Sequence, residues 1–149
     1  MRVFIAIASL LSLSACEPKE EDSATSPHDH HGHHGDTDLP DDFDPSTQQT
    51  SSTGITVSYA TDPSPIPESS EFSVTFTLSS GTMTQADATM PTHGGHGMPV
   101  APVLVQNDDG SYTAQPFEFQ MPGYWVIHAT VKDADGNEER VDFDVDCCE

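Results

Sequence analysis

The sequence predicts an all-β fold: an immunoglobulin-like antiparallel β-sandwich of about seven strands, preceded by an acidic tether. Three observations lead to this prediction. Apolar and polar residues alternate with a period of two over much of the chain after residue 53, turn signals recur between these runs, and no segment has a convincing helical periodicity. Short strands with frequent turns are typical of two sheets packed face to face.

The clearest strand is expected at residues 72–78, where Phe72, Val74 and Phe76 alternate with serine and threonine. Turn signals follow at Ser80-Gly81 and, more strongly, at Asn107–Gly110. The other strands are expected at residues 55–59, 86–90, 103–105, 111–119, 124–131 and 140–146, with a loop rich in Gly, Pro and His at 91–99.

Residues 1–15 have the features of a secretory signal: Arg2, a short apolar run and small residues before Cys16. The sequence Leu13-Ser14-Ala15-Cys16 resembles the bacterial lipobox, in which the cysteine is acylated and becomes the first residue. The alternative is an ordinary secretory signal with a chance cysteine. We expect lipidation of Cys16, which would anchor the protein in a lipid bilayer. The resemblance implies the bacterial cell envelope, and Glu17 favours the outer membrane, facing the periplasm or the cell surface.

The chain carries 25 acidic and 4 basic residues, a formal net charge of −21. With so few basic residues the sequence offers no basic face to neutralise phosphates, so we expect no nucleic-acid partner, and cations are the natural counter-charge. Residues 16–52 hold almost nothing to bury, which predicts a disordered acidic and His-rich tether. One small domain follows at 53–146, and residues 147–149 form a Cys-Cys tail.

The tether contains a tract with several overlapping ways to bind a transition metal such as zinc or copper. Because ordering a flexible segment costs entropy, each such site should be modest in affinity. The alternative is a solvated spacer. The candidate ligands are His28, His30, His31, His33 and His34.

A second candidate site is the loop from Met90 to Met98, which holds two imidazoles and two thioethers. Thioether sulfur combined with imidazole favours copper, particularly Cu(I). Met121, before the sixth expected strand, could reach the same end of the sandwich. The alternative is that the methionines pack at the rim while the histidines are polar loop residues. The candidate metal ligands are Met90, His93, His96, Met98 and Met121.

Cys147 and Cys148 could form a vicinal disulfide, pair with another chain or hold a soft metal ion. His128 is expected on the sheet face opposite Trp125, as a partly exposed residue. The chain shows no nucleophile elbow, no phosphate-binding glycine loop and no paired carboxylates in an apolar setting. We therefore expect no enzymatic activity and no catalytic residues.

Three stretches resemble the YtkA-like domain family: residues 88–97 with the Met-Pro-x-His loop, 109–112 with the Gly-x-Tyr turn, and 119–125 with Met121 and Trp125. The resemblance spans roughly residues 53–145. It implies an immunoglobulin-like sandwich in the envelope, a metal-efflux or other envelope protein as partner, and Met90, His93, His96 and Met121 as site residues. An extra glycine between the two histidines departs from the family pattern.

Two hypotheses follow. The first is an envelope lipoprotein that binds copper or zinc for capture, buffering or hand-over. The second is an immunoglobulin-like interaction domain with no metal role. Metal binding requires His93 and His96 to face one centre, whereas an interaction domain would leave them splayed and expose an apolar patch.

Overall fold

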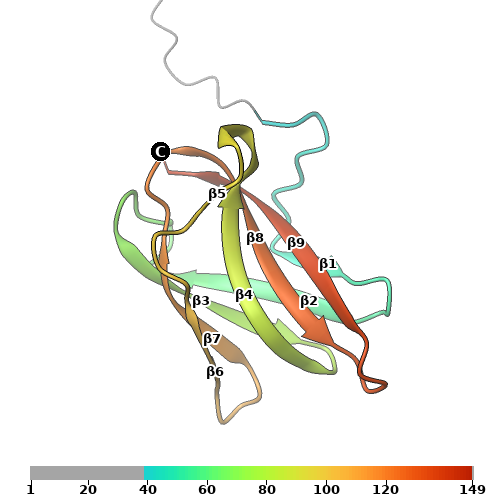
Figure 1. Cartoon of the computed structure of the whole chain (residues 1–149). Coiled ribbons are helices and arrows are strands. Elements are labelled where there is room, and N and C mark those ends of the chain that lie inside the picture. Colours follow the sequence, from blue (N-terminus) through green and yellow to red (C-terminus); the bar gives the residue numbers. More distant parts are fainter. Residues whose placement is uncertain (1–38, 149) are drawn as a thin grey trace, which may run out of the picture. The chain divides into compact units, whose positions relative to one another are not determined.

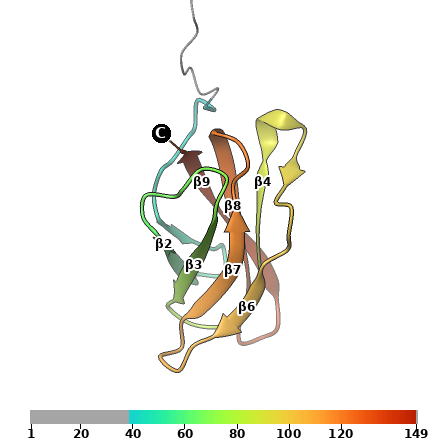
Figure 2. The same ribbon diagram turned by 90° about the vertical axis from the view of Figure 1, so that its left-hand side faces the viewer.

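Two antiparallel sheets make up the domain, which is seen in a computed structural model that describes residues 39–148 (Figure 1). The first sheet has the strand order β1-β2-β3-β7-β6 and the second β5-β4-β8-β9. The sheets face each other as a sandwich (Figure 2), which confirms the predicted fold class. The strands are β1 (Gln48–Thr50), β2 (Thr56–Asp62), β3 (Glu71–Leu78), β4 (Thr82–Met90), β5 (His96–Gly97), β6 (Val103–Gln106), β7 (Tyr112–Glu118), β8 (Gly123–Lys132) and β9 (Glu138–Cys147).

Each of the seven expected strands corresponds to an observed one, and β1 and β5 are additional. Strand β1 pairs with β2, with Gln49 opposite Val57, and so lies before the expected domain boundary at residue 53. Its three residues, Gln-Gln-Thr, are all polar and both end residues are exposed. The strand therefore shows no apolar alternation in the sequence. Strand β5 has two residues and is held by its pairing with β4.

The segment before β1 also belongs to the folded domain. The ring of Phe43 packs edge-on against Tyr124 at 6.1 Å between centroids, and the backbone N–H of Asp44 donates a 3.0 Å hydrogen bond to Asp144. Residues 39–52, expected in the tether, therefore pack on the sandwich. The signal peptide, Cys16, the histidine tract and the rest of the tether lie outside the described residues. Among residues 39–148, no helix is long and apolar enough to cross a membrane.

The core lies between the sheets and follows the alternation read from the sequence. Strand β3 buries Phe72, Val74 and Phe76, while β8 buries Trp125 and every second residue after it. The Trp125 indole stacks on Phe119 with centroids 4.4 Å apart and an interplanar angle of 8°. Fully burying side chains of this size contributes about 1.5–3 kcal/mol each, so this layer is a principal source of stability.

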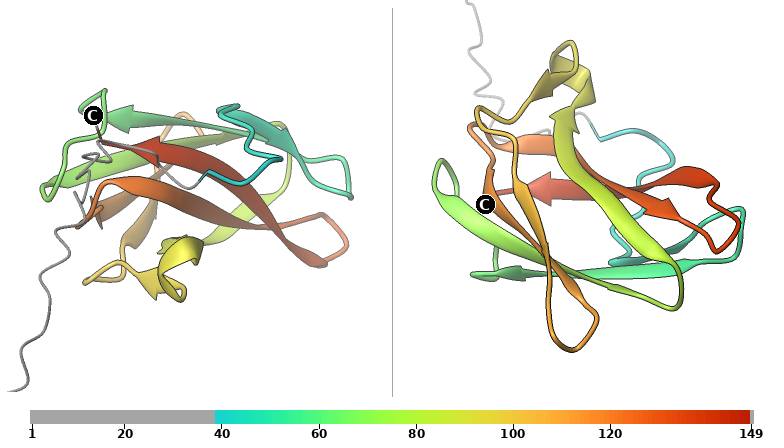
Figure 3. Two further views of the ribbon diagram at one scale, coloured as in Figure 1. Left: turned by 90° about the horizontal axis from the view of Figure 1, so that it is seen from above. Right: turned by 60° about the horizontal axis from the view of Figure 1, so that its bottom comes forward.

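Antiparallel pairing brings the end of β4, the start of β8 and the end of β9 to the same end of the sandwich. Trp125 pairs with Val145, and Gly123 with Cys147. Figure 3 (left) looks down on this end, where the C-terminus and the loop that follows β4 both lie. The candidate loop ligands and the Cys-Cys pair are thus grouped at one end of the domain.

Candidate functional site

The candidate loop is a compact β4–β5 hairpin. A 3₁₀ turn, η1 (Pro91–His93), follows β4, and Gly94 and Gly95 then take positive φ angles of 72° and 75°. Such angles favour glycine, so the glycines noted in the sequence reverse the chain here. The Gly95 N–H donates a 3.2 Å hydrogen bond to the Met90 carbonyl oxygen and closes the turn.

Both hairpin histidines are exposed to solvent. His96 pairs with Met90 across the two strands, and directly paired residues project their side chains on the same face. Met98 follows two residues later, and its half-buried side chain packs against the core. The register therefore places His96 opposite Met90, while His93 lies in the turn itself and Met98 follows the end of β5.

Met90 is a core residue with 1% of its surface exposed. Its terminal methyl carbon lies so close to Gly123 that a Cβ atom added there would be 3.1 Å away. The thioether is thus enclosed between the hairpin and the start of β8. This location agrees with the packing interpretation of Met90 more closely than with an open ligand position.

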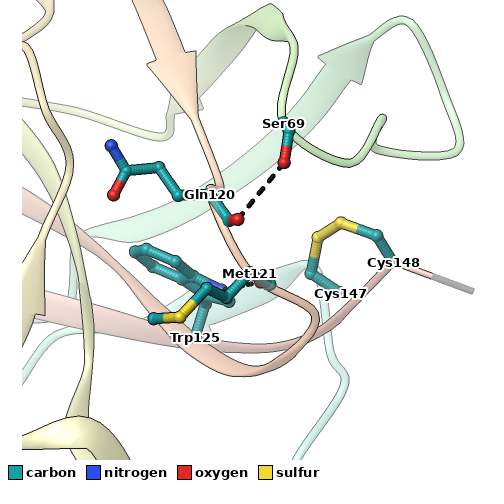
Figure 4. The surroundings of a disulfide bond; sticks show 6 residues. All are labelled: Ser69, Gln120, Met121, Trp125, Cys147 and Cys148. Atoms are coloured by element: carbon teal, nitrogen blue, oxygen red, sulfur yellow. Dashed lines mark hydrogen bonds between the residues drawn. A yellow bond between two sulfur atoms is a disulfide. The ribbon is translucent and has the colours of Figure 1, made fainter.

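Met121 lies in the loop between β7 and β8, half-buried against the core. The Trp125 indole N–H donates a 2.9 Å hydrogen bond to its carbonyl oxygen. The neighbouring Gln120 carbonyl accepts a 3.2 Å hydrogen bond from the Ser69 hydroxyl. Figure 4 shows the Met121 side chain extended beside the Trp125 indole, with the Cys147–Cys148 pair nearby. Hydrogen bonds on both sides therefore hold the backbone that presents Met121.

Sulfur is concentrated at this end of the sandwich. The described residues include six sulfur-bearing side chains. One of them, Met83, is the second residue of β4 and lies at the opposite end. The other five are at the hairpin, the β7–β8 loop or the end of β9: Met90, Met98, Met121, Cys147 and Cys148. The two cysteines form a disulfide with each other.

Within residues 39–148, no three His, Cys, Asp or Glu side chains gather closely enough to hold a metal ion. Such a group would be needed for a structural zinc site, which takes nitrogen, thiolate or carboxylate ligands. Methionine thioethers are not among these zinc ligands. The arrangement can therefore offer soft sulfur and imidazole donors, but no complete zinc-type cluster in this part of the chain.

A row of polar side chains that the sequence pattern did not reveal crosses the outer face of the second sheet. His128, on β8, contacts the Asp142 carboxylate at 2.7 Å through Nδ1 and the Thr89 hydroxyl at 2.8 Å through Nε2. Arg140 holds the same carboxylate at 2.8 Å through Nε. Because a carboxylate only accepts, Nδ1 of the imidazole is the donor. His128 is therefore tied to both neighbouring strands.

The order of hydroxyl, imidazole and carboxylate in this row matches that of a hydrolytic triad. However, Arg140 already pairs with Asp142, and none of these residues lines either of the two cavities described for the domain. The row thus links three neighbouring strands, β4, β8 and β9. Alternation predicts that these side chains face outward, but which of them become neighbours depends on strand register, which a single sequence does not give.

Acidic residues surround Tyr124 near the same end of the sandwich. Its hydroxyl donates a 2.8 Å hydrogen bond to Asp144. Burial, followed by the bond and charge of Asp144, raises the pKa of Tyr124 to about 12. The described basic side chains, Lys132 and Arg140, are both paired with carboxylates. The local field at this end therefore favours a cation.

The fold and the site define a small all-β sandwich with a sulfur-rich, acidic end. Comparisons with family models, with curated proteins and with solved structures find no match for this chain. The likeness to YtkA-like domains thus rests on the short motifs quoted above.

Proposed function

We propose that the protein is a cell-envelope lipoprotein that captures copper, as Cu(I), and buffers it or hands it to a partner. One observation carries this proposal: three of the four described methionines, Met90, Met98 and Met121, lie at the end of the sandwich that also presents His93 and His96. Thioether and imidazole together favour Cu(I).

The ligand set that we propose consists of Met98, Met121 and His96, with His93 as a further exposed donor. Met98 and Met121 are half-buried, so their sulfur atoms can remain near solvent while their stems pack on the core. Met90 is 1% exposed, so in this proposal it packs in the core and is not one of the ligands. Copper is favoured over zinc, because zinc rarely takes thioether ligands.

The acidic charge of the chain supports the same function, since it attracts cations and repels anions. The histidine tract at 28–34 would supply weaker sites that collect ions near the membrane. Lipidation at Cys16 and a YtkA-like role beside an envelope efflux system are parts of this proposal. Mass spectrometry of the protein from membranes, compared with Cys16→Ser, tests the anchor directly.

Cu(I) binding can be measured by competition with a chromophoric chelator, under anaerobic conditions and with the disulfide intact. The key variants are His93→Ala/His96→Ala and Met98→Leu/Met121→Leu. Matched controls are His128→Ala, which removes an imidazole from the sheet face, and Met83→Leu, which removes a thioether from the opposite end.

We expect each double variant to weaken the tightest Cu(I) site at least tenfold, while both controls keep the parent affinity. The histidine tract contributes the same background to every sample. If the double variants bind as tightly as the parent, the hairpin is not the copper site. The proposal fails equally if the controls weaken binding by the same factor.

A second function, protein interaction, is favoured by a different observation. Val100, Val103 and Val105 are 53%, 64% and 52% exposed. The latter two belong to β6, the edge strand of the first sheet, whose outer side is unpaired. An open edge with exposed apolar residues is a template for strand addition. Crosslinking in cells tests this: Val103→Lys/Val105→Lys should abolish a specific adduct while leaving Cu(I) binding unchanged.

A further inference from the structure

The Cys147–Cys148 pair lines a cavity at the sulfur-rich end of the domain. This cavity has a volume of about 890 Å³ and lies between β2, the proline-rich segment after it and the end of β9. Its walls include Tyr59, Pro65 and Ile66. The hairpin histidines and methionines do not line it, so it is separate from the proposed hairpin site.

The two cysteines differ in their access to this cavity. Cys147 ends β9 on its inward face, is 3% exposed and belongs to the core cluster. Cys148 is half-buried and packs against that cluster from the cavity side. Figure 4 shows the pair close to the chain end, with the bonded sulfur atoms side by side. Both cysteines line the cavity, and Cys148 is the more exposed residue of the two.

The charge around the pair selects for cations. Asp146 also lines the cavity, and no lysine or arginine is among the residues that form its walls. The Asp146 carboxylate would repel an anion in the cavity, and no basic side chain in the cavity wall would offset that repulsion. A cation would be attracted both by this carboxylate and by the thiolates that reduction of the disulfide releases.

We infer that the reduced Cys147–Cys148 pair is a second metal site, which binds one soft cation of the Cu(I) class and is closed by disulfide formation. Adjacent thiolates are strong soft donors, whereas the sulfur atoms of a disulfide are poor ones. The oxidation state of the pair thus decides whether the site exists. This inference does not depend on the hairpin site.

A dithiol is one reductant that can open the site. Its two sulfur atoms join in a disulfide, while two electrons and two protons pass to the Cys147–Cys148 bond and yield two thiols. Cu(I) then displaces the two thiol protons and forms two Cu–S bonds, without a change in the oxidation state of copper. Reoxidation by a disulfide oxidant would release the ion.

The test compares oxidised and reduced protein in anaerobic Cu(I) titrations with a chromophoric chelator. The full chain carries Cys16→Ser in every sample, so that Cys147 and Cys148 are the only cysteines. A phosphine reduces the disulfide and is removed by desalting, and thiol counting should then give two thiols per chain.

We expect reduction to add one Cu(I) per chain. This added ion should be absent in Cys148→Ser and retained in His93→Ala/His96→Ala, which separates it from the hairpin site. Cys148→Ser is preferred to a change at Cys147 because Cys148 lies outside the fully buried core. Circular dichroism and thermal unfolding should confirm that the reduced protein and the variant remain folded.

Asp146→Asn tests the electrostatic part of the argument. We expect this substitution to lower the affinity for the added Cu(I) roughly threefold, because it removes one negative charge beside the thiolates. Asp135→Asn, in the turn between β8 and β9 at the opposite end, is the matched control and should have no effect. The inference is overturned if reduction adds no Cu(I), or if Cys148→Ser retains the added ion.

Discussion

The indole N–H of Trp125 donates a 2.9 Å hydrogen bond to the carbonyl oxygen of Met121. Trp125 is 1% exposed and stacks on Phe119, whereas Met121 is half-buried at the sulfur-rich end. One core side chain therefore sets the backbone of a candidate ligand. This relationship couples the stability of the domain to the geometry of the proposed copper site.

We expect Trp125→Phe to lower the free energy of unfolding by about 2–3 kcal/mol, because it removes the hydrogen bond and leaves part of the indole volume empty. Cu(I) affinity should fall as well, since Met121 loses its anchor. Phe119→Leu is the control: it removes the stacking partner but keeps the hydrogen bond. Urea unfolding and chelator competition measure both effects. Unchanged affinity in Trp125→Phe would separate Met121 from the copper site.

Gly123→Ala should destabilise the domain by roughly 2–3 kcal/mol. Its φ of 121° disfavours any side chain, and the added Cβ would lie 3.1 Å from the Met90 methyl. Gly136→Ala is the matched control, because its φ is 90° but its surroundings are open. It should cost only the backbone term, about 1 kcal/mol. Equal losses in thermal unfolding would show that Met90 does not restrict this position.

The hydrogen bonds of Glu139 predict that part of the domain's free energy of unfolding is lost at acid pH. Its carboxylate accepts hydrogen bonds from the backbone N–H groups of Ser52 at 2.7 Å and Thr53 at 3.2 Å, and these bonds lower its pKa below 4.5. A lowered folded-state pKa adds stability above the ordinary value, which is lost as the pH falls through the folded value.

Glu139→Gln should therefore narrow the difference between the melting temperatures at pH 7 and near pH 3, mainly by lowering the value at pH 7. The measurement is thermal unfolding across this pH range. Glu68→Gln, in the exposed loop between β2 and β3, serves as the control and should leave the difference unchanged. An unaltered pH profile in Glu139→Gln would contradict the assignment.

The surroundings of Tyr124 predict that part of the domain's stability is lost at alkaline pH, the opposite direction of pH to the effect at Glu139. Burial and Asp144 raise its pKa from 10.0 to about 12, so its contribution is present below pH 10 and is lost as the pH rises through 12. Asp144→Asn should lower this pKa, and Tyr124→Phe should remove one phenol that titrates near pH 12. Ultraviolet absorbance titration of tyrosinate follows both changes. Asp135→Asn should leave the titration unaltered.

Much of the fold could be predicted because alternation reports burial residue by residue. Phe72, Val74 and Phe76 face the core as expected, and so do Trp125 and Ile127. Strand β1 was missed, because its polar residues are held by pairing with β2 rather than by burial. The short β5 was missed for the same reason, so the hairpin was expected only as a loop.

The candidate site was less predictable. The sequence indicated soft donors in one loop, but it could not distinguish the enclosed Met90 from the half-buried Met98. The sequence predicts His128 only as a partly exposed residue on the face opposite Trp125, yet strand register brings Thr89 and Asp142 to its two ring nitrogens. Which outward residues meet is a property of paired strands, and residues on separate strands carry no mark of that pairing.

The sequence by itself determined the all-β class, the inward face of each main strand and the acidic character of the chain, since these depend on local composition and periodicity. Only the tertiary structure decided that Met98, Met121, Cys147 and Cys148 lie at one end, and that Cys147 and Cys148 line a cavity. These arrangements depend on sheet order and register. Contacts between distant segments, rather than neighbours along the chain, determine both.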